Sequence, residues 1–286
     1  MGRNVLDKNR RSRESTKKRI VAVLEGVVLL VFTAVCLFPV LWIVLSSFKS
    51  HIDAIIIPPV WLFRPLLSNY LQIISGKFAR YFMSSLIVAT TSTFIVLLVG
   101  IPAGYAFAKF PIKRKKDLLF WILTTRMAPP IVILLPYYLA FIKFHLLDTH
   151  VAIILMHLTI NLSLAVWIMK GFFQEIPSGL EDAALVDGCG YLGAFIRVML
   201  PLCRPGIVAT GILCFIFSWN ELLFAITIGA QNVKTLPPSV YDFVTYREVL
   251  WPQLCAAATV IVIPVMVFVF IVQKHLIRGM TMGAFK

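Results

Sequence analysis

Charged residues are scarce in this sequence, although the chain is long enough to form a sizeable protein. Charged side chains make up only 14% of the 286 residues, whereas hydrophobic residues make up 59%. A soluble protein of this length could not bury so many apolar side chains, so the composition excludes an ordinary soluble domain. The composition therefore indicates an integral membrane protein.

The residue patterns that indicate bound groups are also missing. The five cysteines form no close-spaced pair and the five histidines have no metal-ligand spacing, so neither a disulfide framework nor a metal site is expected. The motif G-x-x-x-x-G-K followed by Ser or Thr, which cradles ATP phosphates, does not occur. No nucleophile and base form a recognisable set, which disfavours a membrane enzyme.

Acidic residues are few, and the excess of basic residues is unevenly placed. The chain has 13 Asp and Glu against 27 Lys and Arg, which gives a net charge of +14. Eight of the basic residues precede residue 20, and five more lie within 109–116. Basic clusters beside apolar runs are typical of membrane topology and of contact with anionic lipid, so a nucleic-acid partner is not expected.

Six apolar runs are long enough to cross a bilayer. They cover residues 20–45, 81–108, 118–142, 151–169, 206–228 and 252–272. With both ends inside, 19 Lys and Arg fall in inner segments and seven in outer loops, as the positive-inside rule favours. We predict an all-α protein with a cytosolic arm at 1–19, a six-span domain at 20–273 and a cytosolic tail at 274–286.

The break at 171–206, between the fourth and fifth spans, carries the most specific pattern. A helix is predicted to begin at Pro177-Ser178, with Ser178 and Glu181 at the spacing of a capping box, and to end at Gly188 and Gly190. An apolar segment at 191–200 also has helical spacing and is predicted to end at the prolines that follow it. The whole break is expected to lie in the cytosol.

This break resembles the EAA loop of binding-protein-dependent ABC importer permeases. The family pattern reads E-A-A, three residues, G, nine residues, I, one residue, L-P. This chain has Asp182-Ala183-Ala184, then Gly188, then Val198, then Leu200-Pro201, so only Asp for Glu and Val for Ile differ. The resemblance implies a coupling helix that docks on a cytosolic ATPase. The residues that it implies for docking are Glu181, Asp182, Ala183, Ala184, Asp187 and Gly188. An ordinary amphipathic connector helix is the alternative.

Three further stretches extend the resemblance to the carbohydrate-uptake branch, of the maltose-system second-permease type. They are the sequence AGYAFAKF at 103–110, Trp219-Asn220-Glu221, and the last nine residues at 278–286. The resemblance implies a second homologous permease, two ATPase subunits and an extracytoplasmic solute-binding protein as partners, all at the cell inner membrane. ATP and Mg would bind to the ATPases and no cofactor to this chain, while Met282 and Gly283 in the tail would also reach the ATPases.

Several polar residues are predicted to lie at membrane depth, where they are costly and invite a functional interpretation. From the helical rise, Arg126 lies ~12 Å and Glu221 ~22 Å from the cytosolic end. Each could face the translocation pathway or could have a local partner. Trp219, Asn161 and Asn220 are further pathway candidates, although helix–helix hydrogen bonding is favoured for the two asparagines.

A self-sufficient secondary transporter or channel is the alternative function. It would need inverted repeats and its own ion-coupling carboxylates at the midplane, but the sequence shows no clear repeat and Glu221 is a lone candidate. The solute stays open among a sugar, a sugar alcohol and a glycerol phosphate.

Overall fold

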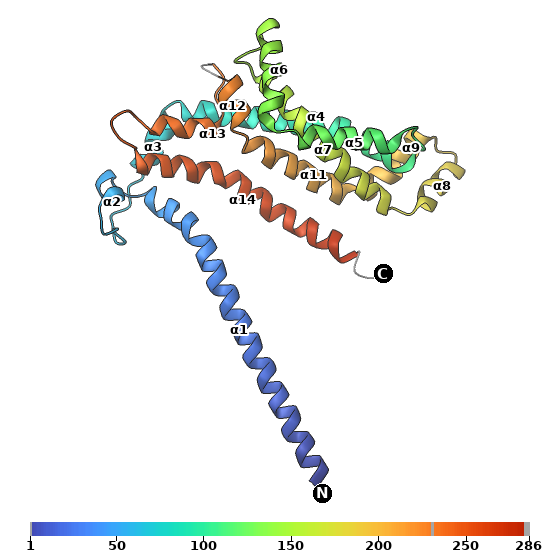
Figure 1. Ribbon diagram of the computed structural model, residues 1–286, viewed down its shortest axis with the longest axis horizontal. Coiled ribbons are helices and arrows are strands. Elements are labelled where there is room, and N and C mark those ends of the chain that lie inside the picture. The colour runs from blue at the N-terminus through green and yellow to red at the C-terminus, as the bar shows by residue number, and fades with distance from the viewer. Residues whose placement is uncertain (1, 230–231, 283–286) are drawn as a thin grey trace.

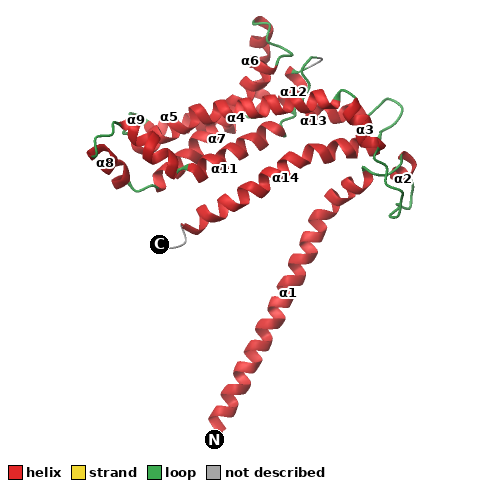
Figure 2. Cartoon of the chain, turned by 180° about the vertical axis from the view of Figure 1, so that it is seen from behind, coloured by secondary structure: helices red, strands yellow, loops and turns green. Residues whose placement is uncertain are grey.

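The computed structural model describes the backbone of residues 2–229 and 232–282, and the side chains of residues 21–229 and 232–271. Every element of regular secondary structure in these residues is helical (Figures 1 and 2). The long helices are α1 (Gly2–Ser46), α4 (Phe78–Lys109), α7 (His150–Glu175), α11 (Arg204–Trp219) and α14 (Trp251–Met282). The fold is therefore the all-α membrane architecture that the sequence predicts.

Four helical segments are individually long and apolar enough to cross a membrane: Val21–Ser46, Phe78–Lys109, His150–Glu175 and Trp251–Ile271. Two bent helix pairs raise the number to as many as six among the described residues, if each pair counts as one span. One pair is α5 (Lys115–Met127) with α6 (Pro130–Lys143), which meet at 90°. The predicted third span is thus not continuous, because Pro129 and Pro130 remove two backbone donors at the break.

The predicted fifth span is interrupted as well. The helix α11 begins two residues earlier than predicted and ends at Trp219, and a short helix α12 (Leu223–Ile228) follows after a break. Upstream lie α9 (Tyr191–Ala194), the π-helix η1 (Phe195–Met199) and α10 (Leu200–Leu202), bent by 75° against α11. Residues 191–202 are helical without a gap, so Pro201 lies one residue before the end of this segment, close to the predicted place. Pro205 follows the break and lies in the first turn of α11, where the missing N–H has no partner to lose.

The predicted terminal segments continue the neighbouring helices in the structure. The backbone is helical from Gly2 into the first span, and α14 continues past its apolar part to Met282. The predicted domain boundaries at residues 19 and 273 therefore do not coincide with helix ends, and their functional meaning stays a prediction.

The centre of the molecule is a close packing of α4, α7 and α11 (Figure 1). A Cβ atom at Gly100 would lie 2.8 Å from Cβ of Ala165, and one at Gly104 would lie 2.7 Å from Cβ of Met169. The two glycines are four residues apart, as are their partners, so small residues let the backbones of α4 and α7 approach closely. We refer to this closely packed pair of helices as the α4–α7 platform.

The short helices gather at opposite ends of this bundle. The helices α2 (His51–Ile55) and α3 (Ser68–Ser75) lie at one end and α8 (Ser178–Val186) with α9 at the other (Figure 1). The segment between α12 and α14 adds α13 (Leu236–Ser239) and the 3-10 helix η2 (Val240–Phe243) beside α4 and α14. In both views α1 extends away from the bundle (Figures 1 and 2), and none of its most apolar window is buried within the chain.

Candidate coupling helix and membrane-embedded polar cluster

The start of helix α8 differs from the prediction, whereas its end agrees with it. Its N-cap residue is Pro177, which makes no side-chain capping bond, and Ser178 is already helical. The predicted capping box is therefore wrong. At the other end the prediction is confirmed: Gly188 has φ +86°, and the N–H groups of Gly188 and Cys189 bond to the carbonyls of Leu185 and Ala184. Only glycine adopts this left-handed conformation without strain.

The two faces of α8 have different surroundings. Glu181 and Ala184 are buried against the chain's own helices, whereas the other four predicted docking residues, Asp182, Ala183, Asp187 and Gly188, are exposed. Val186 lies on the exposed side with 87% of its surface accessible. Glu181 and Ala184 thus face the chain's own helices, and a docking role for the six residues stays a prediction.

Glu181 is held by a residue from a distant part of the sequence. The hydroxyl of Tyr105 on α4 donates a hydrogen bond to Oε1 of Glu181, at 2.5 Å. The ring of Tyr105 packs against Phe110, Phe173 and Phe195, with ring centroids 4.7 to 5.6 Å away. No local sequence pattern links these two residues, although both lie in stretches that carry the family resemblance.

A second polar contact fixes the segment that leads into α8. Lys109, in the last turn of α4, donates a hydrogen bond of 2.8 Å from Nζ to the carbonyl of Ile176. Ile176 is the C-cap residue of α7 and immediately precedes Pro177. The bond satisfies a carbonyl at the end of α7 that the helix itself leaves unpaired.

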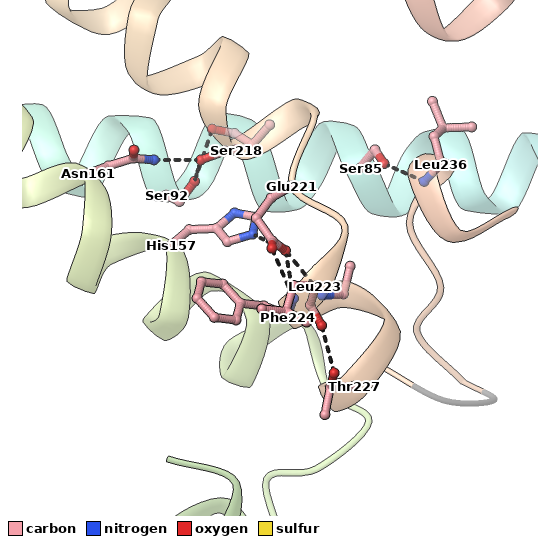
Figure 3. Close-up of polar contacts among 12 residues, drawn as sticks. Ser85, Ser92, His157, Asn161, Ser218, Glu221, Leu223, Phe224, Thr227 and Leu236 are labelled. Atoms are coloured by element: carbon pink, nitrogen blue, oxygen red, sulfur yellow. Dashed lines mark hydrogen bonds and ion pairs between the residues drawn. The ribbon is translucent and has the colours of Figure 1, made fainter. Parts of the chain in front are cut away.

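A cluster of polar side chains lies between α4, α7 and α11 inside the bundle (Figure 3). Nδ2 of Asn161 donates to Oγ of Ser218 at 2.9 Å, and the hydroxyls of Ser92 and Ser218 are 3.0 Å apart. All three side chains are buried. Asn161 therefore joins α7 to α11, and Ser92 extends the network to α4.

Glu221 lies in the break between α11 and α12 and has partners within the chain (Figure 3). Its two carboxylate oxygens accept hydrogen bonds from the N–H groups of Phe224 and Ala225 at 2.9 to 3.1 Å. Nε2 of His157 on α7 lies 3.6 Å from its Oε2. The carboxylate thus caps the first turn of α12, where a negative charge is stabilised by the helix dipole.

The remaining pathway candidates are divided between the interior and the surface. Trp219 is 1% exposed and donates from Nε1 to the carbonyl of Ile261 on α14, so it joins α11 to α14, and its pathway role stays a prediction. Asn220 is exposed and donates to the carbonyl of Ile216. The guanidinium of Arg126 lies over the ring of Phe217 at 4.9 Å, and no ion pair between Arg126 and Glu221 occurs in the described part of the chain. A pathway role for Arg126, Asn161, Asn220 and Glu221 stays a prediction.

The tail candidates lie at the limit of the described chain. Met282 is the last residue of α14, and its side chain is not described. Gly283 lies outside the described residues. Their contact with an ATPase stays a prediction.

Comparison with known proteins identifies the class. The family described as the inner membrane component of binding-protein-dependent transport systems matches residues 100–282, and the chain belongs to it. The chain is therefore a transport subunit of the ABC importer type, a multi-pass protein of the inner membrane. The matched range includes α8 as well as Asn161, Ser218 and Glu221.

Curated relatives match nearly the whole chain. A probable ABC transporter permease protein of Sinorhizobium fredii is 38% identical, over 90% of this chain and 92% of that protein. The trehalose transport system permease protein SugB of Mycobacterium tuberculosis is 35% identical, over 87% and 92%. The sulfoquinovosyl glycerol transport system permease protein SmoH of Agrobacterium fabrum is 32% identical, over 87% and 89%.

A solved structure shares the fold at low sequence identity. It contains a bacterial ABC transporter involved in the import of the acidic polysaccharide alginate, and one of its chains aligns with a TM-score of 0.75 at 22% identity. The alignment covers 90% of this chain and 97% of that chain. A chain of the alginate transporter in complex with a pentasaccharide-bound periplasmic protein aligns with a TM-score of 0.68 at 11% identity.

Proposed function

We propose that this chain forms half of the translocation pathway of an ATP-driven importer for a carbohydrate or a related polyol. Membership of the family supports the role in an importer. The names of two relatives, which transport trehalose and sulfoquinovosyl glycerol, support the solute class. The few ionisable residues at membrane depth fit a solute without several charges. A second, homologous permease would supply the other half of the pathway.

The exposed face of α8 is the observation that supports docking on an ATPase. It combines Asp182, Ala183 and the apolar Val186 on a helix at one end of the bundle. A small residue lets a partner backbone approach, a carboxylate can bind a cation or a helix N-terminus, and an exposed valine gains by burial. We infer that α8 is the coupling helix, and that the ATPases hold ATP and Mg while this chain holds no cofactor.

The arrangement of the partners follows from the placement of α8. Two ATPase subunits would dock at the α8 end, and an extracytoplasmic solute-binding protein would dock at the opposite end, where α2 and α3 lie (Figure 1). Both termini would then be cytosolic, in agreement with the excess of basic residues in the inner segments. The apolar surface of α1 would be covered by lipid or by the second permease.

Charge reversal at Asp182 tests this function. The complex of this chain with its cognate permease and ATPases is purified as wild type and as Asp182→Lys, and ATPase retention is measured. We expect the variant to lose most of its ATPase, because a buried unpaired charge at an interface costs about 3–5 kcal/mol. The matched control is Glu175→Lys, an exposed carboxylate at the end of α7. Full retention of the ATPase by Asp182→Lys, with the chain still folded in the membrane, would contradict docking through α8.

A further inference from the structure

The burial of Glu181 requires a physical explanation beyond docking. A glutamate side chain is costly to bury unless its oxygens are hydrogen-bonded, yet Glu181 is only 7% exposed in the first turn of α8. Its partner is the hydroxyl of Tyr105, which is itself 5% exposed. A phenol hydroxyl at such a site also needs a partner, so each group satisfies the other.

Tyr105 is held in a fixed position relative to the bundle. Its ring lies among three phenylalanine rings, and the neighbouring Gly104 brings α4 into close contact with Met169 on α7. The close α4–α7 packing leaves little freedom for the hydroxyl to follow a moving partner alone. A displacement of Glu181 must therefore break the hydrogen bond or move α4 with it.

The hydrogen bond between Tyr105 and Glu181 joins α8 to α4, which is not one of the elements closest to α8. The backbone of α8 is nearest to α9 and η1, which follow it directly in the chain. Lys109 fixes the carbonyl of Ile176, where α7 gives way to the loop before α8. The contact of Lys109 fixes the segment that precedes α8. The bond of Tyr105 fixes α8 itself at Glu181, five residues after Ile176. The two contacts come from the same end of α4.

We propose that the hydrogen bond between Tyr105 and Glu181 transmits the movement of α8 to α4. Glu181 is then a positioning residue within this chain and does not contact the ATPase. This proposal rests on the proposed function, in which α8 moves with the ATPases. It adds that α4 is the helix that receives the movement. Packed elements with two discrete arrangements carry such movements between sites.

A distance measurement in the assembled complex tests the connection. Spin labels are attached through non-natural amino acids at Gly179 on α8 and Leu98 on α4, both exposed, so that the native cysteines stay unchanged. The distance is measured in the resting complex and in the complex trapped with ADP and vanadate. We expect one unchanged distance in the wild type, and a shifted or broadened distance in trapped Tyr105→Phe. A distance that changes in the wild type, or no difference between wild type and Tyr105→Phe, would overturn the proposal.

The rate of ATP hydrolysis gives a second readout that a purely structural role would not change. We expect the ratio of the rates with and without the binding protein to fall about 3- to 10-fold in Tyr105→Phe and Glu181→Ala, as the loss of one hydrogen bond implies. Glu181→Gln keeps an acceptor oxygen, so its ratio of hydrolysis rates should lie close to that of the wild type. The double variant should be no worse than either single one, because both remove the same bond.

Controls separate this proposal from the docking proposal. Tyr191→Phe removes a hydroxyl from a tyrosine that is 59% exposed, and its ratio should equal that of the wild type. Loss of the ATPase from Glu181→Ala but not from Tyr105→Phe would place Glu181 at the ATPase and overturn the positioning role. Docking through α8 fails on a different result, namely an Asp182→Lys complex that keeps its ATPase and its wild-type ratio.

Discussion

Glu181 and Glu221 both have hydrogen-bond partners inside this chain, but the partners lie at very different sequence separations. Glu221 bonds to N–H groups three and four residues further along, at the start of α12. Glu181 bonds to Tyr105, 76 residues away on α4. A short-range bond shapes the segment that contains it, whereas a long-range bond joins two elements that could otherwise move separately. We therefore expect Glu221 to affect stability mainly and Glu181 to affect coupling mainly.

The surroundings of the two glutamates support the same distinction. Glu221 lies beside His157 and close to the network of Ser92, Asn161 and Ser218, where three helices are joined in the middle of the bundle (Figure 3). Glu181 lies at the end of the bundle, on a helix whose opposite face is exposed. We therefore expect the polar groups in the middle to hold the helices together, and those at the end to receive a movement from a partner.

The largest expected effect comes from damaging the platform that carries Tyr105. In Gly104→Ala the new Cβ would lie 2.7 Å from Cβ of Met169 and 2.9 Å from the backbone nitrogen of Lys170, so α4 and α7 must separate. We expect a loss of about 1–3 kcal/mol of stability, together with a reduced stimulation of ATP hydrolysis. Thermal unfolding of the purified complex measures the first effect.

A matched glycine on α7 serves as the control. A Cβ at Gly171 would have no atom within 4 Å, so Gly171→Ala should leave stability unchanged or raise it by up to about 1 kcal/mol. If Gly104→Ala is as stable as Gly171→Ala, the close packing of α4 on α7 does not form the platform described here.

An intermediate effect is expected from Glu221→Ala. The substitution removes the cap from two N–H groups of α12 and leaves His157 without its neighbouring carboxylate, so stability should fall by about 1–2 kcal/mol. Glu221→Gln keeps one acceptor and should lose less. The stimulation of ATP hydrolysis should be retained in the molecules that stay folded. If Glu221→Ala had wild-type stability but lost the stimulation of ATP hydrolysis, Glu221 and not Glu181 would act in coupling, and the comparison would be reversed.

The smallest effect is expected from Ser218→Ala, within the network that joins α7 and α11. Interhelical hydrogen bonds in membranes contribute about 0.6 kcal/mol on average, so the shift in unfolding temperature should be slight. A double-mutant cycle with Asn161→Ala isolates the contribution of the bond. A coupling energy near zero would show that the network does not join these helices in the membrane.

The features that the sequence could predict depend on local residues. Gly188 ends α8 because a left-handed residue is needed at that position, and glycine is visible in the sequence. The runs at 20–45, 81–108, 151–169 and 252–272, which lie in single long apolar helices, could be predicted because hydropathy is a local property. The resemblance at Asp182, Ala183, Ala184 and Gly188 was visible for the same reason, since the motif is contiguous.

The features that were missed depend on contacts across the fold. Ser178 and Glu181 have the spacing of a capping box, but the bond to Tyr105 prevails and no local signal reveals it. Pro205 follows the helical segment 191–202, as predicted, but it also lies in the first turn of α11, because proline fits the start of a following helix. The break after Trp219 had one usable signal, the polar pair Asn220 and Glu221 within an apolar run.

We propose that this chain is a passive permease whose helix α8 is driven by separate ATPase subunits. The most direct test is uptake of labelled trehalose, a solute of one relative, and of maltose and glycerol phosphate into liposomes. The liposomes contain either this chain alone or the complete complex with binding protein. Our account predicts accumulation against a gradient only for the complete complex supplied with ATP, whichever solute is accepted. Uphill accumulation by this chain alone, without nucleotide, would contradict the account.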